Sequence, residues 1–134
     1  MDVTLNQNST NVAYQCGRWL AAMDQLQKRS ANGKIGVTLG QKFYRAAKRQ
    51  PAKILTMVTD YKEIYLGRIS NDGLRIYFEK LLGEISEKIG ESFPENFSIT
   101  DQGAFDMGYA QQHQNFFSKG SNVENTDDES EEGD

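Results

Sequence analysis

Apolar side chains recur at spacings of three and four near the start of the chain, at Val12, Cys16, Trp19, Leu20, Met23 and Leu26. An α-helix turns once every 3.6 residues, so this spacing places all six side chains on one face. The short side chain of Asn11 is suited to accept a hydrogen bond from the free amides of a first helical turn. The pattern therefore predicts a helix from residue 12 to about Arg29, ending before Asn32-Gly33.

The next apolar positions predict two helices that meet at a proline. Thr38 and Gln41 have the spacing of a capping box, and the second helix carries its apolar side chains at Leu39, Phe43, Ala46 and Ala47. It should stop near Gln50, because Pro51 cannot donate the next helical hydrogen bond. Proline suits the first position of a helix, and the third helix then buries Ile54, Leu55, Val58, Tyr61 and Tyr65.

Two further helices complete the predicted architecture. A turn at residues 70–73 precedes a fourth helix, whose apolar positions are Leu74, Phe78, Leu81, Leu82, Ile85 and Ile89. Gly90 supplies its stop. Ser98 and Asp101 open a fifth helix, with Phe105, Tyr109 and Phe116 facing inward and an end near Lys119. No stretch shows the sustained alternation of a half-buried strand. The expected class is all-α, a bundle of about five helices over residues 1–119.

Charge divides the chain into a basic body and an acidic tail. The 134 residues are enough for one modest domain, and the net charge is −4. Residues 120–134 hold seven acids and no base, whereas residues 1–119 hold 15 bases and 12 acids. A segment with so few apolar residues cannot offset its ordering entropy. We therefore expect residues 120–134 to be disordered.

The strongest chemical signal is a segment, residues 28–53, that holds eight bases and no acid. On the second helix, Lys42, Arg45, Lys48 and Arg49 fall within about 120° of arc, opposite the apolar positions. Tyr44 lies between the two arcs, where its ring could stack on a base. Such a face would bind a phosphate backbone with little sequence preference, and its alternative is an ordinary solvated surface. The predicted nucleic-acid-binding residues are Lys28, Arg29, Lys34, Lys42, Tyr44, Arg45, Lys48, Arg49 and Lys53.

Other classes of function find little support. The longest apolar runs are about five residues, against the ~20 that a membrane-spanning helix needs, and the first ten residues do not resemble a secretory signal. A single cysteine, Cys16, on the apolar stripe favours a core residue in a reducing cytoplasm. A single histidine, His113, leaves no expected metal site or cofactor. An enzyme using Asp101, Asp106 or His113 remains an alternative, although no nucleophile lies at motif spacing.

Four glycines lie inside predicted helices: Gly17, Gly83, Gly103 and Gly108. Each costs about 1 kcal/mol relative to alanine in an isolated helix. We expect them to serve close approach between helices or to a partner.

Several stretches of the sequence resemble a known family. These are NVAYQCGRWLAAMDQLQ, FYRAAKRQPAKI, FEKLLGEISEKI and FPENFSITDQGAFDMGYAQQHQNFF, which together span roughly residues 10–118. They resemble the C-terminal region of the large subunit of type I-C CRISPR surveillance complexes (Cascade), which is also made as a free small subunit. The start at Met1 looks like this free form. The block Asp101-Gln102-Gly103-x-Phe105-x-x-Gly108-Tyr109 is the most distinctive part.

The resemblance implies a helical, non-enzymatic small subunit that helps to hold the DNA strands of an R-loop. Its implied partners are the CRISPR guide RNA, target DNA, the type I-C large subunit, the backbone subunits and further copies of itself. The segment after Tyr109 departs from the family pattern, and the acidic tail lies beyond the resemblance. A stand-alone helical DNA-binding or regulatory protein is the alternative function.

Overall fold

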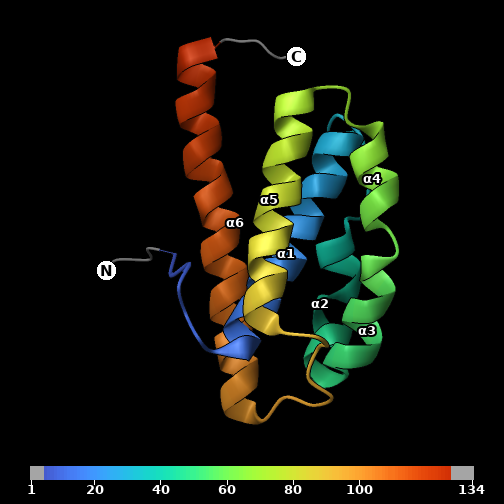
Figure 1. Ribbon diagram of the computed structural model, residues 1–134, viewed down its shortest axis with the longest axis vertical. Coiled ribbons are helices and arrows are strands. Elements are labelled where there is room, and N and C mark those ends of the chain that lie inside the picture. The colour runs from blue at the N-terminus through green and yellow to red at the C-terminus, as the bar shows by residue number, and fades with distance from the viewer. Residues whose placement is uncertain (1–4, 128–134) are drawn as a thin grey trace.

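The computed structural model describes the backbone of residues 5–127 and the side chains of residues 5–118. This part of the chain forms six helices and no strand, which confirms the all-α class (Figure 1). The helices are α1 (Val12–Ser30), α2 (Leu39–Arg49), α3 (Pro51–Thr59), α4 (Lys62–Arg68), α5 (Asp72–Ile89) and α6 (Ile99–Asp127). Asn11, Thr38 and Asn71 cap α1, α2 and α5 with side-chain hydrogen bonds, and Thr38 forms the predicted capping box with Gln41.

The predicted third helix is in fact two helices, α3 and α4. Between them, the amides of Asp60 and Tyr61 donate to the carbonyls of Met57 and Val58, three residues earlier, at 3.2 and 3.0 Å. Hydrogen bonds to the third preceding residue tighten the last turn of a helix. The apolar spacing continues through this break, so the sequence pattern could not reveal it.

The last helix is longer than the sequence predicted. Its backbone continues to Asp127, past the expected end near Lys119. No proline interrupts residues 119–127, and extending an existing helix is much easier than starting one. Residues 128–134 of the acidic tail lie outside the described part of the chain.

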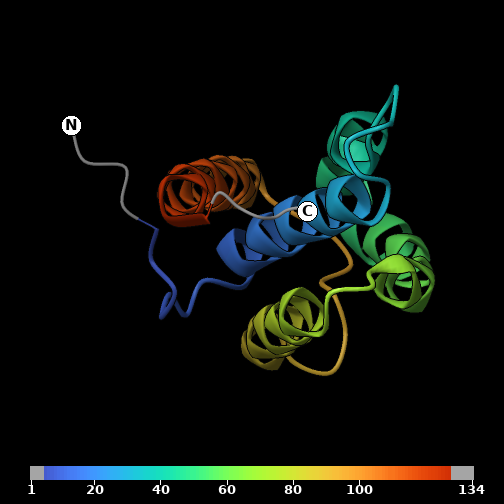
Figure 2. The same cartoon turned by 90° about the horizontal axis from the view of Figure 1, so that it is seen from above.

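Helix α1 lies in the middle of the molecule, with α6, α5, α2 and α4 packed around it (Figure 2). Thirteen of its 19 residues are buried, so α1 is enclosed on several sides and not along one stripe only. Trp19, Leu20 and Met23 are almost fully buried. Cys16 is also buried, as predicted, and burial raises the pKa of its thiol to about 12.

Two of the four helical glycines bring α1 and α6 into backbone contact. A Cβ atom on Gly17 would overlap the carbonyl oxygen of Phe105, and one on Gly108 would overlap the carbonyl oxygen of Tyr14. The prediction of close approach is confirmed for this pair. Gly83 and Gly103 make no such approach to another helix of the chain, because a Cβ there would meet open space.

The start of α2 is held by side chains of α1. The Asp24 carboxylate, which is 1% exposed, accepts a hydrogen bond from the Gly40 amide at 2.7 Å. The Gln27 side chain accepts one from the Leu39 amide at 2.7 Å. These amides have no partner within the helix itself, and a carboxylate there also interacts favourably with the helix dipole. Asp24 and Gln27 therefore fix the position of α2 on α1.

Asp24→Ala is expected to reduce the free energy of unfolding by about 1–3 kcal/mol, because it leaves a buried amide donor without its charged acceptor. Asp24→Asn keeps an acceptor and should cost less. Urea unfolding followed by circular dichroism measures both. Asp60→Ala is the matched control at an exposed aspartate, where a change within about 0.5 kcal/mol is expected. Equal losses for Asp24→Ala and Asp60→Ala would contradict this role.

Candidate nucleic-acid interface

The outward side of α2 carries three exposed cations: Lys42, Arg45 and Arg49. We call this set the α2 basic face. Its orientation follows from the helix itself, because Leu39 and Ala47 on the opposite side are buried in the core. Lys42 also lies over the ring of Phe43, with its Nζ 5.4 Å from the ring centroid. Within residues 5–118, no acid forms an ion pair with these three cations.

Two predicted site residues on α2 turn toward α6 instead. Lys48 forms an ion pair with Asp106, with Nζ 2.9 Å from Oδ1, and the Tyr44 hydroxyl donates to the same carboxylate. The Tyr44 ring packs on Phe105 and Tyr109 at centroid distances of 5.6 and 4.8 Å. Burial and the bond to Asp106 raise the pKa of Tyr44. Both side chains therefore hold α2 against α6, and we do not retain Tyr44 as a base-stacking residue.

The remaining predicted cations lie on α1, on α3 and in the loop between α1 and α2. Lys28, near the end of α1, pairs with the buried Asp24 at 3.3 Å. Arg29 and Lys34 are exposed at the end of α1 and in the following loop, and Lys53 is exposed in the first turn of α3. The structure thus leaves Lys34 and Lys53 exposed on the segments that precede and follow α2. The charge of Arg29 acts instead on Tyr77 of α5, and Lys28 and Lys48 already have acidic partners.

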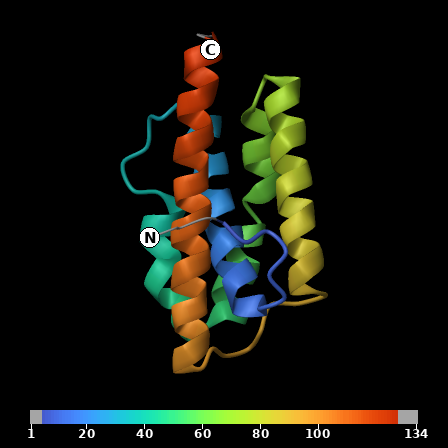
Figure 3. The same ribbon diagram turned by 90° about the vertical axis from the view of Figure 1, so that its left-hand side faces the viewer.

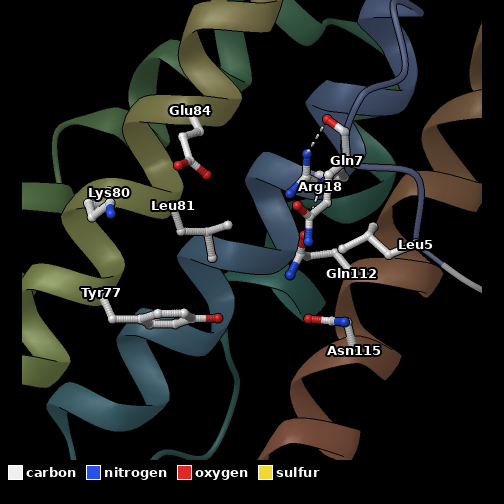
Figure 4. A pocket seen from close by; sticks show the side chains of 9 residues that line it. All are labelled: Leu5, Gln7, Arg18, Tyr77, Lys80, Leu81, Glu84, Gln112 and Asn115. Carbon is white, nitrogen blue, oxygen red and sulfur yellow. Dashed lines mark hydrogen bonds between the residues drawn. The ribbon is translucent and has the colours of Figure 1, made fainter.

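A polar pocket of about 240 Å³ lies between α1, α5 and α6, beside the segment that precedes α1 (Figure 4). Arg18, which is 2% exposed, donates from Nε to the side-chain oxygen of Gln112 at 2.9 Å. Its Nη1 donates to the Gln15 side chain at 2.9 Å and to the Gln7 carbonyl at 3.4 Å. Burial lowers the pKa of Arg18, while attraction from Tyr14 and Glu84 acts in the opposite direction. Arg18 therefore connects the N-terminal segment, α1 and α6.

An aromatic row on α6 is the feature that sequence reasoning missed. It consists of Tyr109, His113 and Phe117, spaced four residues apart, and it lines an open hollow of about 370 Å³. The spacing was visible in the sequence. However, a pattern of this kind does not show which rings face the core: Phe116 is buried, as predicted, whereas its neighbour Phe117 is 61% exposed.

The groups considered for catalysis have structural contacts. Asp101 forms a capping box with Ser98 at the start of α6, with each backbone amide donating to the other side chain at 3.0–3.1 Å. Asp106 holds Lys48 and Tyr44. Burial and the positive charge of Lys28 lower the pKa of His113, partly opposed by Asp24. Among the described residues, no group of three or more His, Cys, Asp or Glu side chains is placed to hold a metal ion.

Together these features define an all-helical protein with an exposed cationic helix. None of the described helices is long and apolar enough to cross a membrane. The family model of the CRISPR-associated protein Cas_Csd1 matches residues 1–117, which include every helix of the bundle except the end of α6. The chain therefore belongs to the Cas_Csd1 family of CRISPR-associated proteins. No curated protein matched the sequence.

Proposed function

We propose that this chain is the non-catalytic small subunit of a type I-C CRISPR surveillance complex and holds target DNA strands through the α2 basic face. Membership of the Cas_Csd1 family supports a component that works with other CRISPR-associated proteins and nucleic acid. The observation that carries the proposed role is the α2 basic face itself. Three exposed cations follow one side of an 11-residue helix whose other side is anchored in the core.

This surface has the chemistry that a strand-holding subunit needs. Contacts to phosphates position a nucleic acid without reading its sequence. In RNA-guided complexes the guide–target pairing supplies sequence recognition, so the protein surface can be tolerant of sequence. Lys34 and Lys53, exposed on the segments that precede and follow α2, add to the positive charge of this part of the chain.

Membership of the complex is tested by purifying a tagged form of the chain from its native host. We expect it to bring down an RNA of uniform length, the large subunit and repeated backbone subunits. Recovery of the chain alone, or with duplex DNA only, would contradict the proposed role. The second result would favour a stand-alone DNA-binding protein.

Charge reversal tests the α2 basic face. The double variant Arg45→Glu/Arg49→Glu should weaken retention of target DNA by the assembled complex by roughly tenfold or more at moderate salt. The slope of log affinity against log salt should also become shallower by about 1–2, because fewer counterions are released. Filter binding at several salt concentrations measures both quantities.

The matched control is Lys80→Glu/Lys88→Glu on α5, where both lysines are exposed. It changes the net charge by the same amount but leaves α2 intact. Equal effects from the two double variants would mean that overall charge, and not the α2 basic face, determines retention. An unchanged salt slope in the α2 variant would show that Arg45 and Arg49 do not contact phosphates.

A further inference from the structure

The three rings of the aromatic row contact one another along α6. Tyr109 and His113 lie nearly parallel, with ring centroids 5.9 Å apart and an interplanar angle of 9°. His113 and Phe117 are perpendicular at 4.8 Å. A spacing of four residues brings side chains over one another on a helix surface, so each ring packs against the next. These contacts hold the three rings in place relative to one another.

The free end of the row reaches solvent. Tyr109 is half-buried and contacts Tyr44 of α2, whereas Phe117 is 61% exposed. The hollow beside the rings is completed by Ala110 and Gln114, both exposed on α6. A large exposed ring is costly to leave in water, and aromatic side chains on a rigid element often mark a binding site.

One side of the row faces segments that carry lysines, of which Lys28 is paired with Asp24. Figure 3 shows α6 in front, with α2 and the loop between α1 and α2 along the same side and α5 on the other. The loop carries the exposed Lys34, and Lys28 lies close enough to His113 to lower its pKa. Because its pKa is held below the ordinary value, the imidazole is mainly neutral at pH 7. The row is therefore an uncharged aromatic surface beside cations.

We propose that the aromatic row stacks on unpaired bases of a single-stranded nucleic acid whose phosphates contact the α2 basic face. This inference rests on the proposed function and adds a second nucleic-acid-binding site, the aromatic row, to the α2 basic face. Stacking on an aromatic ring is tolerant of sequence because every base has a π-face. Bases in a duplex already stack on their neighbours, so the row selects single strands. Charge complementarity favours this occupant, because a nucleic acid supplies both flat apolar rings and negative charge.

Binding of two fluorescent oligomers to the free subunit tests the inference. One is an oligothymidine, and the other is an abasic chain with the same number of phosphates. The wild-type protein should bind the oligothymidine roughly tenfold more tightly, because only this oligomer offers rings for stacking. Phe117→Ala should remove most of this preference while leaving the salt slope unchanged, since no phosphate contact is lost.

Two matched variants complete the design. Phe117→Trp should restore or strengthen the preference. Met107→Ala removes a side chain that is 52% exposed on another face of α6 and should have no effect. A thermal melt of each variant checks that the fold is retained, which is expected for an exposed position.

The outcomes separate the two proposals. Equal binding of both oligomers by the wild-type protein would overturn the stacking site and leave the α2 basic face standing. Phe117→Ala could instead keep its affinity for the oligomers but lose partner proteins from the purified complex. This result would assign the row to a protein contact and also overturn stacking. Binding of neither oligomer would contradict nucleic-acid binding by the free subunit and the stacking site with it.

Discussion

Gly108→Ala is expected to reduce the free energy of unfolding by about 3 kcal/mol. The new methyl group would overlap the carbonyl oxygen of Tyr14, which belongs to the backbone of α1. A side chain could rotate away, but a helix backbone has no such freedom, so α1 and α6 would have to separate. Inserting a methyl group into a closely packed core typically costs about 1–3 kcal/mol. Because the neighbouring atom belongs to a rigid helix backbone, we expect a loss at the upper end of this range.

Gly17→Ala should have a similar effect, because its methyl group would overlap the carbonyl oxygen of Phe105 from the other side of the same contact. The double variant should cost less than the sum of the single ones, since the separation of the helices occurs only once. Unfolding in guanidinium measures the free energy of unfolding of the two single variants and the double variant.

Gly83→Ala and Gly103→Ala are the controls for this prediction. Both positions are helical, exposed and open to a Cβ atom. Alanine is the better helix former, so each change should raise stability by up to about 1 kcal/mol. A similar loss of stability at all four glycines would show that the close approach of α1 and α6 is not the cause.

Arg18→Met is expected to destabilise the protein by about 2–4 kcal/mol. The change keeps much of the side-chain volume but leaves the side-chain oxygens of Gln15 and Gln112, both almost fully buried, without their donor. An unsatisfied buried polar group costs about 1–3 kcal/mol. Arg18→Lys should recover little of this stability, because a single ammonium group cannot reproduce the fork of the guanidinium.

A second substitution distinguishes an unpaired acceptor from lost packing. In Arg18→Met/Gln112→Leu, one of the stranded amides is replaced by an apolar group, so the double variant should be more stable than Arg18→Met alone. Urea unfolding of the single and double variants measures the coupling. A double variant less stable than Arg18→Met would mean that packing dominates at this site.

The sequence predicted those parts of the fold that depend on neighbouring residues. The apolar spacing of α1, the capping box at Thr38 and the stop at Pro51 each involve residues within one or two turns, and all three are present. The break at Asp60 and Tyr61 was missed because Val58, Tyr61 and Tyr65 keep a helical spacing through it. A hydrophobic pattern records which residues are buried and not where a helix is interrupted.

The parts of the site that were missed depend on contacts between distant segments. On a single helix, Lys42 and Lys48 look equivalent, and only the packing of α2 against α6 brings Asp106 to Lys48. The same packing turns the half-buried Tyr44 toward Asp106 of α6. Asp24 could not be recognised as a cap for α2, because its acceptor role depends on a fold that places Gly40 beside it.

The central position of α1 has a consequence for how the protein is made. Helix α1 leaves the ribosome before its most extensive partner, α6, and four other described helices separate the two in the sequence. Contacts between segments that are far apart in the sequence form slowly, because a long loop must close first. The apolar surface of α1 therefore stays incompletely covered until α6 has been synthesised, and such surfaces attract chaperones and promote aggregation. A chain that stops before residue 99 would lack the helix that completes its core.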